Sequence, residues 1–391
     1  MRPEALNKLA GLGALGGLAS FAWLGLLTVR PNRLSSGVGV TTWEVSPGWE
    51  AAVILLLWIT VLYLAVRLAD VKRANLAVLI CANLLIIVTF WSAGRSAARL
   101  LQAAEPLTRV SLGAGAWGML LAAYLVILAG RSRITKSGKI MSSLWMPMLA
   151  GLIISGQMGD LSIMQELAAR QDRFGAELGQ HLYLAGLAVG IATAVGVPLG
   201  IGAFRSNVAR RISFPVLNIV QTIPSLALFG LLIAPLAILS SRSPLMRTIG
   251  VEGIGWAPAL IALILYSLLP ITRNTFTSLR IIDPALIEAG LGMGMSRLQL
   301  LFRVQIPLAI PVIFSGIRTA AVQTIGNTAL VALIGAGGLG TFIFQGIGQS
   351  APDLIMLGAL PVIILAVLVD GIMQVCIAWL TPRGWSYGQS D

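Results

Sequence analysis

Residues 283–307, DPALIEAGLGMGMSRLQLLFRVQIP, form a polar segment between two long apolar stretches. The run Glu288-Ala289-Gly290 is followed by Gly294 and then by Val304-Gln305-Ile306-Pro307. Charged side chains and irregular backbone are costly in lipid, so the segment is expected to lie outside a bilayer. A folded, glycine-rich segment beside a membrane indicates a place where a partner docks.

The composition around this segment is that of a membrane protein. The chain has 391 residues, of which 57% are hydrophobic and 11% are charged, whereas soluble domains carry about 25% charged residues. Only helices and closed barrels satisfy their backbone in lipid, and the apolar stretches lack the alternation of a barrel. We therefore predict an all-α, polytopic membrane protein with about ten membrane-spanning helices. The predicted spans are 9–29, 50–66, 76–93, 112–130, 141–158, 181–204, 212–240, 256–272, 306–334 and 354–380.

The basic residues predict the orientation. Placing the N-terminus in the cytoplasm puts the larger share of lysine and arginine into cytoplasmic loops, as the positive-inside rule requires. Both termini and the segment 283–307 are then cytoplasmic. The net charge of +12 is spread over separate loops, without the basic stripe of a nucleic-acid-binding protein.

A polar stretch at 159–180 divides the chain. It separates an N-terminal membrane extension, 1–160, from a C-terminal domain, 175–382. The two parts show no internal repeat, which argues against an inverted-repeat secondary transporter.

The segment 283–307 has the start signals of two short helices. Asp283 is a helix-capping carboxylate followed by proline, and Ser296 with Gln299 matches a capping box. The helices would expose Leu286, Ile287 and Leu291 unless a partner covered them. The alternative is an amphipathic loop on the membrane surface.

At full spacing, Glu288-Ala289-Gly290, Gly294 and Ile306-Pro307 resemble the EAA signature of ABC-importer permeases. Gly290 replaces the family's usual second alanine. The stretches QTIPSLA (221–227), GIRT (316–319) and GAGGLG (335–340) resemble the glycine betaine, carnitine and choline branch. The N-terminal extension resembles the YehY type of osmoprotectant permease.

The resemblance implies a type I ABC importer permease core in the C-terminal half, in a bacterial inner membrane. Its function would be the uptake of glycine betaine-like osmoprotectants. The partners would be ABC ATPase subunits, an extracytoplasmic substrate-binding protein and a second permease, identical or paralogous. The residues that dock with the ATPase would be Asp283, Glu288, Ala289, Gly290, Gly294 and Pro307.

No catalytic residue, metal site or bound cofactor is expected in this chain. The sequence has no GxxxxGK[ST] motif, since Gly138-Lys139 lacks the upstream glycine and the hydroxyl. ATP and Mg²⁺ therefore belong to the partner ATPase, and the chain is a transporter subunit rather than an enzyme.

The alternatives are an ABC permease for another small solute, such as an amino acid or sulfonate, and, more remotely, an ion-coupled secondary transporter. The latter predicts intramembrane carboxylates, of which the core spans contain clearly only Asp370.

Two groups of polar residues lie within the core spans, where they either line a translocation pathway or form hydrogen bonds between helices. Pro224 has no backbone N–H and therefore interrupts the backbone hydrogen bonds of the helix predicted at 212–240. The first group is Gln221, Thr222 and Ser225 beside Pro224, and the second is Gln323, Thr324, Asn327 and Thr328.

The glycine-rich stretch 335–340 matches GxGxxG, but it follows a membrane span rather than a strand, which excludes dinucleotide binding. We interpret its glycines as an outer gate loop: Gly335, Gly337, Gly338 and Gly340.

Three further observations concern an arginine within a span, the histidine and the tryptophans of the C-terminal domain. Arg318 is a charge within a span, for which pairing with Asp370, snorkelling and substrate contact are all open. His181 opens a span and is expected at the membrane interface. Trp256, Trp379 and Trp385 stand near span ends and form no aromatic cage for a quaternary ammonium group, which indicates that a separate binding protein supplies the affinity.

Overall fold

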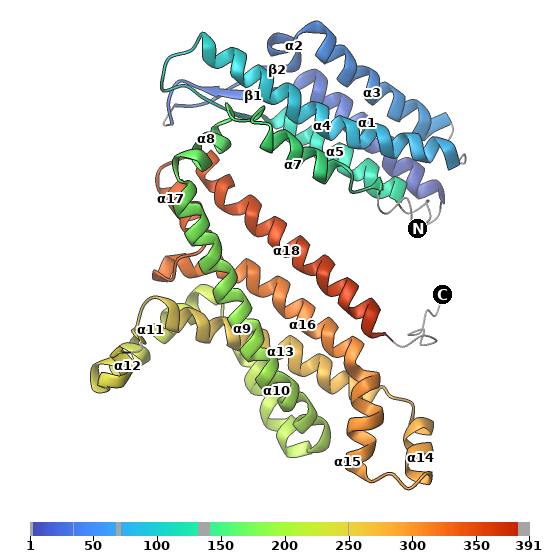
Figure 1. Ribbon diagram of the computed structural model, residues 1–391, viewed down its shortest axis with the longest axis vertical. Helices are drawn as coiled ribbons and strands as arrows, with labels where there is room; N and C mark the ends of the chain where they lie inside the picture. Colours follow the sequence, from blue (N-terminus) through green and yellow to red (C-terminus); the bar gives the residue numbers. More distant parts are fainter. Residues whose placement is uncertain (1–2, 34, 68–71, 132–140, 249, 382–391) are drawn as a thin grey trace. The chain divides into compact units, whose positions relative to one another are not determined.

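The computed structural model describes residues 3–33, 35–67, 72–131, 141–248 and 250–381 (Figure 1). Gly138, Lys139 and Trp385 lie outside these ranges. The chain divides into two compact units, 1–169 and 170–391. Within the described ranges, seven helices are long and apolar enough to cross a membrane, and two shorter apolar helices accompany them. This number is roughly consistent with the ten predicted spans.

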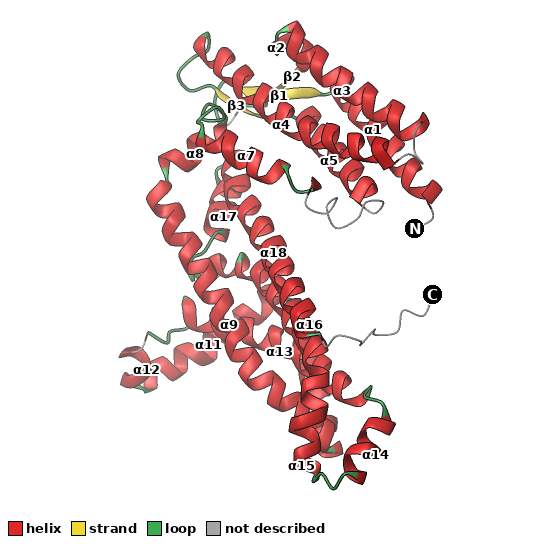
Figure 2. Cartoon of the chain, turned by 45° about the vertical axis from the view of Figure 1, so that its right-hand side comes forward, coloured by secondary structure: helices red, strands yellow, loops and turns green. Residues whose placement is uncertain are grey.

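Unit 1 is a helical layer with a small sheet. Its helices are α1 (Pro3–Trp23), α2 (Thr42–Val45), α3 (Gly48–Arg67), α4 (Lys72–Gln102), α5 (Ala114–Arg131), α7 (Trp145–Ile154) and α8 (Ser162–Ala169). Its strands are β1 (Gly25–Arg30), β2 (Val38–Thr41) and β3 (Arg109–Leu112). They form an antiparallel sheet in the order β2-β1-β3, drawn in yellow in Figure 2.

Two predicted spans of unit 1 are shorter than expected. The first helix ends at Trp23 instead of continuing to residue 29, because the next residues form β1 and pair with both other strands. The span predicted at 141–158 contains the ten-residue helix α7. In unit 1 the core lies between α1, α3, α4 and α5, with Phe21, Ile54 and Trp58 fully buried. A Cβ on Gly17 would lie 2.2 Å from the Trp58 ring, so α1 approaches α3 closely only because residue 17 is glycine.

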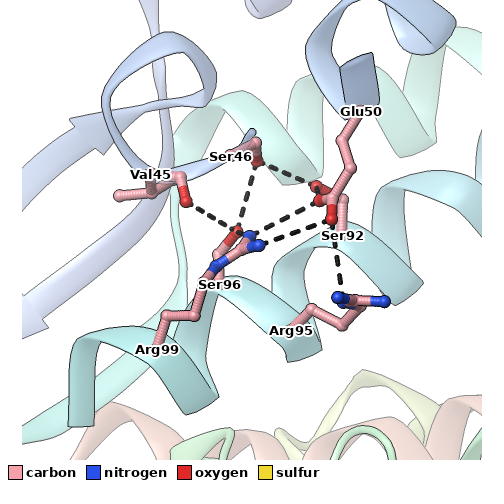
Figure 3. A network of polar contacts seen from close by, with 7 residues as sticks. All are labelled: Val45, Ser46, Glu50, Ser92, Arg95, Ser96 and Arg99. Carbon is pink, nitrogen blue, oxygen red and sulfur yellow. Dashed lines mark hydrogen bonds and ion pairs between the residues drawn. The ribbon is translucent and has the colours of Figure 1, made fainter. Parts of the chain in front are cut away.

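A buried carboxylate joins the start of α3 to the end of α4 (Figure 3). Glu50 is fully buried and accepts a hydrogen bond of 2.8 Å from the Ser92 hydroxyl. The guanidinium group of Arg99 lies 3.5 Å from the same carboxylate, and that of Arg95 lies 3.7 Å from it. The charge of a buried glutamate is tolerated where it is paired and hydrogen-bonded in this way.

We expect Glu50→Ala to destabilise unit 1 by about 1–3 kcal/mol. The substitution removes the carboxylate that Ser92 and the two arginines share, and the cost stays below that of a fully buried pair because the arginines remain partly exposed. The midpoint of thermal unfolding of the purified protein in detergent measures the change. Glu105→Ala, at an exposed glutamate of the same unit, is the matched control. Equal midpoints for the two variants would contradict the structural role of Glu50.

Unit 2 contains the remaining helices. In chain order they are α9 (Gln171–Arg205), α10 (Asn207–Thr222), α11 (Ser225–Arg242), α12 (Pro244–Thr248), α13 (Trp256–Arg280), α14 (Pro284–Gly292), α15 (Arg297–Leu300), the π-helical turn η1 (Leu301–Gln305), α16 (Ile306–Thr328), the 3₁₀ helix η2 (Leu330–Ile334), α17 (Gly340–Gly348) and α18 (Pro352–Leu380). The span predicted at 212–240 is divided into α10 and α11 at Ile223-Pro224, because Pro224 has no N–H to donate.

Small residues allow α9, α13 and α16 to pack closely. A Cβ on Gly200 would lie 2.6 Å from the Thr275 Cβ, and a Cβ on Gly316 would lie 2.6 Å from the Asn274 Cβ. Such close backbone approach is how helices associate where lipid removes the hydrophobic driving force. The outward faces of α10, α11 and α18 are strongly apolar, with exposed residues such as Ile212, Leu231 and Ile364.

Candidate functional site

The segment 283–307 folds into two short helices at one end of unit 2, and α17 lies at the other end (Figure 1). The Asp283 carboxylate accepts a hydrogen bond of 2.9 Å from the backbone N–H of Ala285 and caps α14. Ser296 and Gln299 form the capping box of α15, with bonds of 2.8 and 3.3 Å. Both predicted helix starts are confirmed. We call this segment the α14–α15 knob.

Two glycines explain why the knob is compact. Gly290 is buried, and a Cβ at this position would lie 2.5 Å from Leu300 Cδ1, so α14 rests directly against α15. Gly294 has a φ of +81°, a backbone conformation that side-chain-bearing residues rarely adopt. The motif thus requires a small residue at 290 and glycine at 294 for geometrical reasons.

Helix α14 and the turn after it expose apolar side chains around the acidic Glu288. Leu286, Leu291 and Met293 are exposed, the last by 72%. Ile287 differs from the prediction, because it packs against Leu279 and Ile282 in the core of unit 2. Glu288 is exposed and forms no ion pair or side-chain hydrogen bond with any described residue. An exposed apolar patch of this kind marks a surface for another protein or for a membrane.

The knob is joined to the membrane part by one continuous helical rod. Helix α15 passes into η1 and then into α16, so that residues 297–328 form a single span-length helix. Pro307 lies in the first turn of α16, where its missing N–H costs no hydrogen bond. Helices α15 and α16 are therefore continuous through η1.

Helix α16 has a polar, partly exposed face. Ser315, Thr319, Gln323 and Asn327 recur at every fourth position, and all four are at least partly exposed. Residues at this spacing lie on the same face of a helix. The side chains of Gln323 and Asn327 form no hydrogen bond with other described residues. A polar face on a span-length helix fits contact with water or another protein rather than with lipid.

The structure separates the second group of polar residues into two kinds. Thr324 and Thr328 are buried, and the Thr324 hydroxyl hydrogen-bonds to the Ser267 hydroxyl of α13 at 2.7 Å. Thr328 donates to the carbonyl of Thr324 at 2.7 Å. Thr324 thus joins α16 to α13 and Thr328 is bonded within α16, whereas Gln323 and Asn327 belong to the partly exposed polar face.

The first group surrounds the break between α10 and α11. Gln221 donates a hydrogen bond of 2.5 Å to the carbonyl of Tyr266, which ties α10 to α13. Thr222 donates to the carbonyl of Ile219 within its own helix, at 2.7 Å. Pro224 is exposed at the break and Ser225 is half-buried. Among the described residues, no hydrogen bond joins this group to Asn327 or Thr328.

The glycine-rich loop is held by the start of α9. Gly335, Gly337 and Gly338 have φ values of +78°, +77° and +87°, so the loop depends on glycine. The Glu177 carboxylate accepts hydrogen bonds from the Gly338 N–H at 2.6 Å and from the Thr341 hydroxyl at 3.3 Å. The Gln180 amide donates to the carbonyl of Ala336 at 3.2 Å.

Residues 186–384 match the family described as binding-protein-dependent transport system inner membrane component. The chain belongs to this permease family. Residues 7–164 match the N-terminal domain of the ABC transporter permease YehY. Permeases of this family are transport subunits and not enzymes.

Named relatives of the permease match about half of this chain and nearly all of their own length. An osmoprotectant import permease protein of Salmonella typhimurium is 47% identical over 52% of this chain and 90% of its own. A glycine betaine/carnitine/choline permease of Bacillus subtilis is 40% identical, over 53% and 88%. A carnitine transport permease of Listeria monocytogenes is 44% identical, over 52% and 86%.

The residues of α9 that hold the glycine-rich loop of the permease were not predicted from the sequence. Glu177, Gln180 and His181 lie at spacings of three and four residues on α9, a spacing that places them on one helix face. His181 is not at an interface but fully buried, with Nε2 at 3.1 Å from the Ile325 carbonyl. Only the spacing of these polar residues at the start of an apolar helix indicated their role.

The intramembrane charge of the permease is paired. Arg318 of α16 donates from Nε to Asp370 Oδ1 at 2.6 Å and from Nη2 to Asp370 Oδ2 at 2.9 Å. Gln374 donates to the same carboxylate at 2.7 Å. Pairing with Asp370 is therefore confirmed.

Proposed function

We propose that this permease imports quaternary ammonium osmoprotectants such as glycine betaine. The observation that carries the proposal is the 47% identity with an osmoprotectant import permease over 90% of that protein's length. Two further relatives are named for glycine betaine, carnitine and choline transport or for carnitine transport. An amino acid or sulfonate permease is the alternative, and no relative reported above carries such a name.

The α14–α15 knob is the coupling element in this proposal. Its residues Asp283, Glu288, Ala289, Gly290, Gly294 and Pro307 shape or face a surface that docks with a cytoplasmic ABC ATPase, which binds ATP and Mg²⁺. The exposed apolar patch, the unpaired Glu288 and the continuous helix 297–328 support this role. Closure of the ATPase pair would move α15 and, through it, the polar face of α16.

The translocation pathway runs along the polar face of α16 and the α10–α11 break. Asn327 and Gln323 support it by their exposure, as do Thr222, Pro224 and Ser225. Gln221 supports the pathway indirectly, by fixing α10 against α13, and Thr328 belongs to it by its place beside Asn327 in the last turn of α16.

The other partners follow from the same proposal. The loop with Gly335, Gly337, Gly338 and Gly340 faces an extracytoplasmic binding protein, and a second permease, identical or paralogous, completes the pathway. The permease domain, 175–382, and its membrane extension, 1–160, lie in the bacterial inner membrane with both termini in the cytoplasm.

Uptake of radiolabelled glycine betaine tests the substrate. Cells that lack other betaine importers and express this permease with its ATPase and binding protein should accumulate the label. Accumulation should cease when the permease gene is omitted. Uptake of an amino acid or a sulfonate instead of betaine would contradict the proposed substrate.

A further inference from the structure

The ion pair between Arg318 and Asp370 lies deep in the predicted membrane region. Arg318 is about 18 Å along α16 from Ile306, and Asp370 is about 15 Å along α18 from Leu380. Both side chains are 33% exposed, so the pair lies at a surface of unit 2. An ionised pair at this depth marks a functional site more often than a structural one.

Arg318 has hydrogen-bonding capacity to spare. Nε and one N–H of Nη2 point to Asp370, while Nη1 forms no hydrogen bond with the described residues. A guanidinium group carries five N–H donors in a planar fork that fits a carboxylate. The side chain is a third exposed, so these N–H groups are open to an acceptor from outside unit 2.

The pair borders the polar face of α16. Ser315 lies three residues before Arg318, so these two side chains are neighbours on the helix surface, whereas Thr319, Gln323 and Asn327 lie progressively further round the helix. A solute at the Ser315 end of this face would therefore lie beside the free N–H groups of Arg318, with the Asp370 carboxylate next to them.

We propose that Arg318 and Asp370 form a weak binding site for zwitterionic substrates that carry a carboxylate and a quaternary ammonium group. The inference rests on the proposed function and names the contacts within its pathway. The carboxylate of the substrate accepts hydrogen bonds from the free N–H groups of Arg318. Its ammonium group lies near the Asp370 carboxylate.

Charge balance favours a zwitterion over a simple ion at this site. The pair is neutral before the substrate arrives and remains neutral with a zwitterion bound, so no uncompensated charge is created at membrane depth. The described aromatic residues of unit 2 provide no cage for an ammonium group: Trp379 is exposed, and the ring pairs are Phe174–Phe342 and Phe214–Phe276. Recognition by charge alone gives the low affinity that a passing substrate needs.

The test is the ratio of glycine betaine uptake to choline uptake by the complete importer, because choline carries the ammonium group without a carboxylate. Arg318→Lys keeps the positive charge and loses the planar fork, and Arg318→Gln combined with Asp370→Asn removes both charges together. We expect each variant to lower the ratio, by about tenfold for the double variant, as for the loss of a charge-assisted contact. The same binding protein delivers both solutes in every variant, so a changed ratio belongs to the permease.

Ser267→Ala is the matched control, since it removes the hydrogen bond between α13 and α16 and leaves the ion pair in place. It should affect both solutes equally. An unchanged ratio in both ion-pair variants, or a parallel loss of both solutes, would overturn the inference and leave a helix-pinning role. A wild-type importer that carries neither solute would instead contradict the proposed function itself, and this inference with it.

Discussion

Glu288→Lys is expected to abolish transport while the permease still inserts and folds. Glu288 is exposed on α14, and its carboxylate forms no ion pair or hydrogen bond with another described residue. The fold therefore does not depend on its charge. At a docking surface, reversal of a charge places like charges together or leaves one unpaired. We expect the affinity for the ATPase to fall by roughly thirtyfold or more.

The ATPase activity of the purified complex, with and without loaded binding protein, measures this effect together with substrate uptake. The variant should lose both uptake and the stimulation by binding protein, with its thermal midpoint unchanged. Glu252→Lys introduces the same charge change at an exposed loop residue and should leave transport intact. If the Glu288 variant retained stimulated ATP hydrolysis, the coupling role of the α14–α15 knob would be wrong.

Gly340→Ala is expected to disrupt the glycine-rich loop and to destabilise unit 2 by about 3 kcal/mol or more. A Cβ at residue 340 would lie 1.7 Å from the carbonyl oxygen of Ala329 and 2.6 Å from its carbonyl carbon. These are backbone atoms, so no side-chain rotation relieves the overlap. Helix α17 would have to move away from the end of α16.

Thermal unfolding and betaine uptake should both respond strongly to this single methyl group. Gly348→Ala, in the same helix, is the control because a Cβ there meets nothing within 4 Å. Its unfolding midpoint should stay close to that of the wild type. Similar midpoints for the two variants would show that the contact between Gly340 and Ala329 does not hold the loop.

Short-range sequence signals correctly predicted the helix starts and the helix break, because these features depend only on residues close together in the chain. The capping groups of α14 and α15 and the break at Pro224 were found from sequence because each acts within a few residues of backbone. The membrane helices were found because length and hydropathy are also local. Helix ends were less certain, since Leu27 becomes part of a strand only by pairing with Leu112, far along the chain.

The roles of single polar residues needed the tertiary structure. Helix α16 is apolar on most sides, so its sequence does not show which side faces a neighbour. The position of α13 makes Thr324 a buried partner of Ser267 and leaves Gln323 exposed. Likewise, the burial of His181 depends on the packing of α9 against α16, which brings the Ile325 carbonyl to Nε2.

The sequence by itself determined that this protein spans a membrane many times, and that 283–307 folds as a two-helix knob, because hydropathy and capping act over short distances. The tertiary structure decided which polar groups hold helices together and which remain partly exposed on the surface of unit 2. It also joined Arg318 to Asp370 and Glu177 to Gly338. Those contacts depend on how helices rotate and pack against each other, which apolar sequences leave undetermined.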